Sequence, residues 1–152
     1  MKTSSIPTFV SLFLLSGLQP VLAGNITVTP SNQANNLPLG GQGGIQNTQI
    51  IKVGTITLNT TSQNGFILNI TGSNLVNSKG VTPIDIKITT VPAGSGTPGT
   101  GSFTSGVNQT YSYFNNISHA SETRDLYILY TPASLQHPGN YSGYLNLNII
   151  DK

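Results

Sequence analysis

Apolar and polar residues alternate along the last part of the chain, residues 141–150, directly after the turn pair Pro138-Gly139. Side chains at every second position of an extended chain point to the same face, so this alternation predicts a β-strand with one buried face. The apolar face carries Tyr141, Leu145, Leu147 and Ile149. Because such a face needs a second layer to cover it, the pattern predicts further strands elsewhere in the chain.

Three earlier segments show the same period of two. Residues 25–29 alternate Ile and Val with Asn and Thr before Pro30 ends the run, and residues 84–89 alternate isoleucine with polar residues. Residues 49–60 also alternate, but their apolar positions change phase at Gly54. A glycine at such a phase change is typical of a β-bulge, which inserts one extra residue into a strand.

Turn residues separate the remaining strands. Asn64-Gly65 predicts a hairpin that returns through residues 66–70, since this pair accepts the backbone angles of a tight turn. Residues 103–113 predict one or two short strands, and residues 125–131 predict a strand covered on both faces. About seven short strands and no helical period favour an all-β fold, an immunoglobulin-like β-sandwich.

Residues 1–23 have the composition of a secretory signal peptide. Lys2 supplies the positive start, an apolar stretch too short to span a bilayer follows, and small residues precede a cleavage site after Ala23. The mature chain would then hold an extension and a Gly-rich flexible spacer at residues 24–44 and a sandwich domain at residues 45–152. We expect a secreted protein without a transmembrane anchor, because no second apolar run follows.

Charged residues make up only 7% of the chain, against roughly 25% in average soluble domains. The six Lys and Arg residues are scattered singly, so we expect no nucleic-acid partner, which would need clustered positive charge. There is no cysteine, which excludes disulfides and thiolate metal sites. Stability must then come from the sheet core or from neighbouring subunits, and the low charge favours self-association.

Residues suited to catalysis or metal binding are few. Glu122, Arg124 and Asp125 are close in sequence, and we interpret them as an ion cluster on the surface rather than as an acid-base site. His119 and His137 lack carboxylates at ligand spacing, and no nucleophile motif is present. The sequence therefore predicts no catalytic residue, no metal, no cofactor and no enzymatic activity.

Tyrosine offers a second kind of site. Tyr127 and Tyr144 are candidates for stacking against a sugar ring, because a tyrosine side chain combines an apolar face with a polar tip. The alternative is that the tyrosines pack inside the sandwich or along its edge.

The first predicted strand, residues 25–30, stands apart from the others. One interpretation is that Ile26 and Val28 enter an apolar groove on another copy of the chain, where the strand pairs with a free sheet edge. Each of these side chains would contribute roughly 1.5 to 3 kcal/mol if fully buried. The other interpretation is that the segment folds back as the first strand of its own domain, and the sequence leaves both open.

Both ends of the mature chain resemble those of one protein family. Asn25-Ile26-Thr27-Val28-Thr29 and Gly139-Asn140-Tyr141-Ser142-Gly143 are similar to the corresponding ends of chaperone-usher fimbrial pilins, especially the alternate-pathway colonisation-factor type. The lack of cysteine agrees with that type. The resemblance implies an incomplete immunoglobulin-like subunit that a neighbour's donor strand completes, with Ile26 and Val28 in the donor strand.

The resemblance also implies partners and a location. The partners are other copies of the chain or related pilins, together with a periplasmic chaperone and an outer-membrane usher. The location is a fimbria on the cell surface, reached through the periplasm. We therefore expect a structural subunit of a bacterial surface fimbria that assembles by donor-strand exchange. The alternative is a self-contained secreted β-sandwich module that binds carbohydrate or a host surface.

Overall fold

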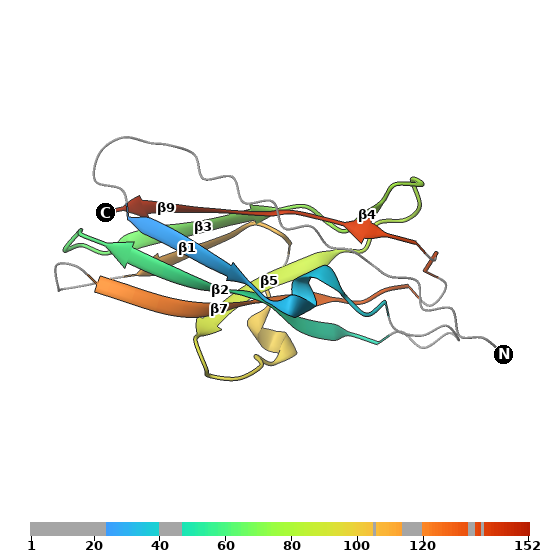
Figure 1. Cartoon of the computed structure of the whole chain (residues 1–152), viewed down its shortest axis with the longest axis horizontal. Helices are drawn as coiled ribbons and strands as arrows, with labels where there is room; N and C mark the ends of the chain where they lie inside the picture. Colours follow the sequence, from blue (N-terminus) through green and yellow to red (C-terminus); the bar gives the residue numbers. More distant parts are fainter. Residues whose placement is uncertain (1–23, 40–46, 105, 114–119, 134–135, 138) are drawn as a thin grey trace.

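Two antiparallel sheets packed face to face make up most of the described chain, and they confirm the all-β prediction (Figure 1). The computed structural model describes residues 24–39, 47–104, 106–113, 120–133, 136–137 and 139–152. In spatial order, the first sheet contains β1 (Asn25–Pro30), β2 (Gln49–Thr60), β7 (Ala120–Tyr130) and β5 (Ile86–Pro92). The second sheet contains β6 (Gln109–Tyr113), β3 (Phe66–Gly72) and β9 (Leu145–Asp151).

Four shorter elements connect these strands. A two-residue pair links β4 (Val76–Asn77) with β8 (Tyr141–Ser142). Two short 3-10 helices, η1 (Asn32–Asn35) and η2 (Thr100–Ser102), lie after β1 and after β5. Regular structure in the described residues is therefore almost entirely extended chain.

The last predicted strand forms, with its apolar face inward. All four of its apolar positions, Tyr141, Leu145, Leu147 and Ile149, are buried, and the residues between them are half-buried or exposed. The strand is interrupted at Gly143-Tyr144, where Tyr144 and Ser73 bond through their main chains instead. The periodicity alone was sufficient to identify which face is buried.

The phase change at Gly54 is a bulge, as predicted. The pairing of β2 with β7 shifts its register between Lys52 and Gly54. After the shift, Ile56 and Leu58 are completely buried. The extra residue therefore lets both halves of this long strand place apolar side chains in the core.

The prediction of a hairpin at Asn64-Gly65 was wrong. The turn is present, with Gly65 at a φ of 87°, but β2 and β3 belong to different sheets and do not pair. Each strand has an apolar face that must be buried. The two apolar faces cover each other when the strands lie in opposite sheets, on either side of the core. The turn therefore carries the chain between layers.

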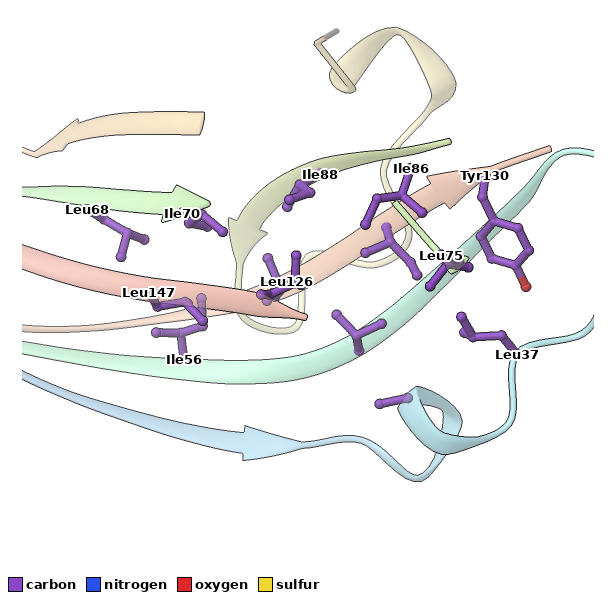
Figure 2. Packing of buried hydrophobic residues seen from close by; sticks show 14 of the residues in the cluster. Leu37, Ile56, Leu68, Ile70, Leu75, Ile86, Ile88, Leu126, Tyr130 and Leu147 are labelled. Atoms are coloured by element: carbon purple, nitrogen blue, oxygen red, sulfur yellow. The ribbon is translucent and has the colours of Figure 1, made fainter. Parts of the chain in front are cut away.

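The core lies between the two sheets (Figure 2). Ile56 and Leu126 of the first sheet face Leu68 and Leu147 of the second, and each is at most 7% exposed. A contiguous core of this kind supplies the stability that a chain without disulfides requires.

Strand β7 is covered on both faces over residues 125–130, in agreement with its sequence pattern, although the strand begins at Ala120, earlier than predicted. Leu126 and Ile128 are buried on the inner face, and Tyr127 is only 6% exposed on the outer face. The connection that follows β5 lies against that outer face, since Gly94 donates a hydrogen bond to Asp125 and Phe103 is buried.

Candidate functional site

The predicted donor residues lie on an edge strand of their own domain. Within the described residues, strand β1 pairs only with β2, opposite Leu58 and Ile56. Ile26 and Val28 are half-buried and pack against the core, whereas Thr27 faces solvent. In this single chain, the segment is the first strand of its own sandwich, which is the second of the two interpretations left open by the sequence.

The residues after β1 pack against the domain, so the prediction of a flexible spacer was wrong for residues 31–39. Ser31 donates hydrogen bonds to the main-chain oxygens of Val53, at 3.0 Å, and Lys52. Ala34 and Leu37 are 1% and 2% exposed. The domain body therefore begins well before residue 45, and the rest of the predicted spacer, residues 40–44, lies outside the described residues.

One buried hydroxyl fixes the end of this segment. Tyr130, on β7, donates a hydrogen bond to the main-chain oxygen of Pro38 at 2.7 Å. Burial raises the pKa of the Tyr130 hydroxyl well above its ordinary value, so the hydroxyl is a permanent donor. Residues 24–39 thus contact the domain through β1, Ser31 and Pro38, and we call them the N-terminal segment.

The N-terminal segment lies where the two sheets are open to each other. Strand β9 pairs with β3 on one side, and within the described residues no strand pairs with its other side. Strand β1 runs near this free edge, and Gly24 comes close to Ile149 and Asp151 (Figure 1). We call this gap between β1 and β9 the open side of the sandwich.

An apolar cavity lies next to Ala34. It lies between η1, the first sheet and the start of β9, with Tyr144 at its rim. Its other lining residues are Val53, Leu75, Ile86, Ile128, Gly143 and Leu145. The N-terminal segment contributes Ala34 to the wall of this cavity.

The two tyrosines proposed for sugar stacking do not form a common site. Tyr127 is 6% exposed on the outer face of the first sheet, so its ring offers no free face to a sugar. Tyr144 is 52% exposed, but it lies at the start of β9 in the second sheet. The structure contradicts the expectation that Tyr127 stacks against a sugar. Tyr144 is exposed, and a sugar-stacking role for it stays a prediction.

Tyr141 has a role that the sequence pattern did not reveal. Its side chain is completely buried, and its hydroxyl donates a hydrogen bond to the main-chain oxygen of His137 at 2.9 Å. Gln136 donates to the same hydroxyl at 2.6 Å. Alternation identified Tyr141 as buried, but the partner four residues upstream follows only from the path of the chain between β7 and β8.

Of the predicted surface ion cluster, Asp125 is buried, contrary to expectation, whereas Glu122 and Arg124 are partly exposed. Asp125 is 4% exposed and pairs with Lys52 at 2.6 Å. Burial alone would raise the pKa of the Asp125 carboxyl, but hydrogen bonds from Lys52, Gly94 and Thr55 outweigh it and hold the pKa below its ordinary value. Such a carboxylate is a structural acceptor and is poorly suited to proton transfer near neutral pH.

Arg124 occupies the opposite, inner face of β7. It contacts Glu122 at 2.6 Å and donates two hydrogen bonds to Thr90. Its guanidinium also lies 5.1 Å from the centre of the Tyr113 ring. The guanidinium of Arg124 therefore contacts both Thr90 of β5 and Tyr113 of β6. It connects the two sheets at the side of the sandwich opposite β1 and β9.

The described residues contain no group of three or more His, Cys, Asp or Glu side chains that could hold a metal ion. No helix within the same ranges is long and apolar enough to cross a membrane. His119, one of the two histidines considered as ligands, lies outside the described residues.

The chain matches no protein-family model, no curated protein and no solved structure. Functional inference therefore depends on the geometry of the open side and of the N-terminal segment that covers it.

Proposed function

We propose that this protein is a structural subunit of a bacterial surface fibre, and that subunits join by exchanging the N-terminal segment. One observation carries the proposal: the outer edge of β9 has no strand partner in the described residues, and the N-terminal segment covers the gap beside it with a few apolar side chains. An unpaired edge next to an apolar groove is suited to receive an extended segment of another chain.

The strand order supports an incomplete immunoglobulin-like sandwich. Such a domain has strands A, B, E and D in one sheet and C, F and G in the other. The order β1-β2-β7-β5 corresponds to A, B, E and D, and the pairing of β3 with β9 corresponds to C with F, whereas β6, on the other edge of β3, has no counterpart among these strands. The place of strand G is then the outer edge of β9.

Tyr141 supports the assignment of β8 and β9 to strand F. In immunoglobulin-like domains a tyrosine near the start of strand F bonds through its hydroxyl to the main chain a few residues upstream. Tyr141 stands at the start of β8, and its hydroxyl donates to His137. This agreement favours strand F over strand G for the last described strand.

The N-terminal segment is suited to exchange between copies. Its contacts with the domain come from side chains and backbone groups that an identical neighbour also presents, so a swapped copy would recover them. Strand β1 is attached only at an edge, and residues 31–48 separate it from β2 in sequence. Exchange therefore requires the release of the edge strand β1 and of Ala34 and Leu37, while the contacts between the two sheets can stay in place.

Export completes the proposal. Residues 1–23 would direct the chain out of the cytoplasm. A periplasmic chaperone and an outer-membrane usher would cover the open side until the N-terminal segment of a neighbouring subunit binds there. This part depends on the resemblance to chaperone-usher pilins. No step of fibre assembly requires catalysis or a cofactor, so we assign no enzymatic activity.

Light scattering coupled to size-exclusion chromatography tests the proposal on the chain from Gly24 to Lys152. We expect dimers and larger species to accumulate when the concentrated protein is incubated. Ile26→Asp should abolish them, because a charge on the inner face of β1 cannot be buried cheaply. Thr27→Asp is the matched control, since Thr27 is exposed on the same strand and its variant should still assemble. A monomer at every concentration would contradict the proposal.

A further inference from the structure

Gly24 lies in a narrow space between the two sheets. A Cβ atom at this position would lie 2.7 Å from the main-chain oxygen of Asn59, 2.8 Å from Ile149 Cδ1 and 3.1 Å from Asp151 Oδ1. Contacts below 3.0 Å to backbone are not tolerated, so only glycine fits without movement of the strands. The start of the N-terminal segment is thereby placed against the end of β9.

Within the described residues, the carboxylate at this position has capacity for further hydrogen bonds. Asp151 Oδ1 accepts a hydrogen bond from Thr60 at 2.5 Å, whereas the two carboxylate oxygens together can accept about four. Among the residues of β1, β3 and β9, Asp151 is the only one with a charged side chain. Lys152 follows it and has interactions of its own. A cation that arrives at Gly24 would find Asp151 as the nearest anionic partner on these strands.

We propose that cleavage after Ala23 creates this cation, and that the α-ammonium group of Gly24 then pairs with the Asp151 carboxylate. Hydrolysis breaks the bond between the Ala23 carbonyl carbon and the Gly24 nitrogen. Water supplies the hydroxyl for the new Ala23 carboxyl group, and the released amine takes up a proton. A neutral amide nitrogen becomes a positive charge on a residue whose Cβ position lies 3.1 Å from a carboxylate oxygen.

The geometry allows the pair to form. The nitrogen of a residue lies about 2.5 Å from its Cβ position, so the Gly24 nitrogen is at most about 5.6 Å from Asp151 Oδ1. Once residue 23 is removed, the terminal nitrogen can turn about the Gly24 backbone and close the remaining distance. The pair joins the first residue of the mature chain to the last residue of β9 across the open side.

Processing would therefore strengthen the closure of the open side. Before cleavage, the segment is held by its apolar contacts and by pairing with β2; after cleavage, an ion pair is added at its first residue. In a fibre the same pair would join the ammonium group of one copy to Asp151 of the next. The inference rests on the proposed export and cleavage, but it does not require assembly, because the pair also forms within one chain.

The test uses the chain from Gly24 to Lys152, which contains every described residue, in four forms. The α-amine is free or acetylated, and residue 151 is Asp or Asn; Asp151→Asn keeps an oxygen that can accept from Thr60. In the Asp151 chain we expect an NMR titration to give an α-amino pKa at least about half a unit above the ordinary 7.7 to 8.0, and the ordinary value in the Asp151→Asn chain. Acetylation should lower the Tm by about 2–4 °C in the Asp151 chain and by less than about 1 °C in the variant.

Equal α-amino pKa values in the two chains, or equal losses of Tm on acetylation, would overturn the inference. Because these measurements are made on monomer, they give the same answer whether or not the protein forms fibres. N-terminal sequencing of the exported chain tests the cleavage itself. A first residue other than Gly24 would also overturn the inference and would leave the assembly proposal standing.

Discussion

Tyr130, at the end of the central strand β7, donates a hydrogen bond to the main-chain oxygen of Pro38, 2.7 Å away. These residues are 92 positions apart in sequence, and the bond fastens the far end of the N-terminal segment to the core. Loss of this bond would loosen the N-terminal segment but would leave the Tyr130 ring packed in the core. The strength with which the segment is held can therefore be changed separately from the packing of the domain.

Tyr130→Phe removes this bond while keeping the ring. The free energy of unfolding should fall by about 0.5–1.5 kcal/mol, since one intramolecular hydrogen bond is lost. Amide hydrogen exchange of residues 31–39 should quicken more than that of β7, because the segment loses its anchor. Tyr127→Phe is the matched control on the same strand. Its hydroxyl makes no hydrogen bond within the described residues, so the change should be within about 0.5 kcal/mol. Equal effects of the two variants would show that the bond does not anchor the segment.

Leu37→Ala tests whether residues 31–39 are part of the core. Leu37 is 2% exposed, so its truncation should cost about 2–4 kcal/mol in a urea titration. The neighbouring Asn36 is exposed, and Asn36→Ala should change stability by less than about 0.5 kcal/mol. If these residues were a loose spacer, both variants would be as stable as the parent chain.

Asp125 should make the protein sensitive to acid. Its pKa is lower in the folded than in the unfolded chain, so its contribution to stability is fully present above about pH 4 and is lost as the pH falls through the folded-state value. Asp125→Asn should therefore be less stable at pH 7 and should show a shallower fall in Tm between pH 4 and pH 2. Thermal melting at a series of pH values measures this, and an unchanged acid slope would contradict the role of the Lys52 and Gly94 contacts.

Regular alternation made part of this fold predictable. The buried face of β9 and the bulge at Gly54 could both be inferred because strands place alternate side chains on opposite faces. Ile26 and Val28 were likewise identified as core-facing residues. Their partner could not be inferred, because an edge strand presents the same pattern to its own domain and to a neighbour.

The remaining features depend on contacts between distant residues. Ala34 and Leu37 are isolated apolar residues in a polar stretch without a period, so nothing local marks them as buried. Asp125 is on the outward face of β7, and the polar connection after β5 gave no sign that it would cover that face. Neither Tyr130 nor Asp151 carries a local signal for its distant partner, Pro38 and Thr60 respectively.

The most direct test of the account compares two chains of nearly identical composition that differ in connectivity. One is the chain from Gly24 to Lys152; in the other, residues 24–39 are moved to follow Lys152 through a short linker. Figure 1 shows the C-terminus beside the start of β1, so the moved segment can reach the same position in the same orientation. Molar mass by light scattering after incubation at high concentration is the measurement. The account predicts assemblies for the first chain and a stable monomer for the second, whose short linker keeps the segment on its own domain. Monomers only, or equal assembly of both chains, would contradict exchange of the N-terminal segment.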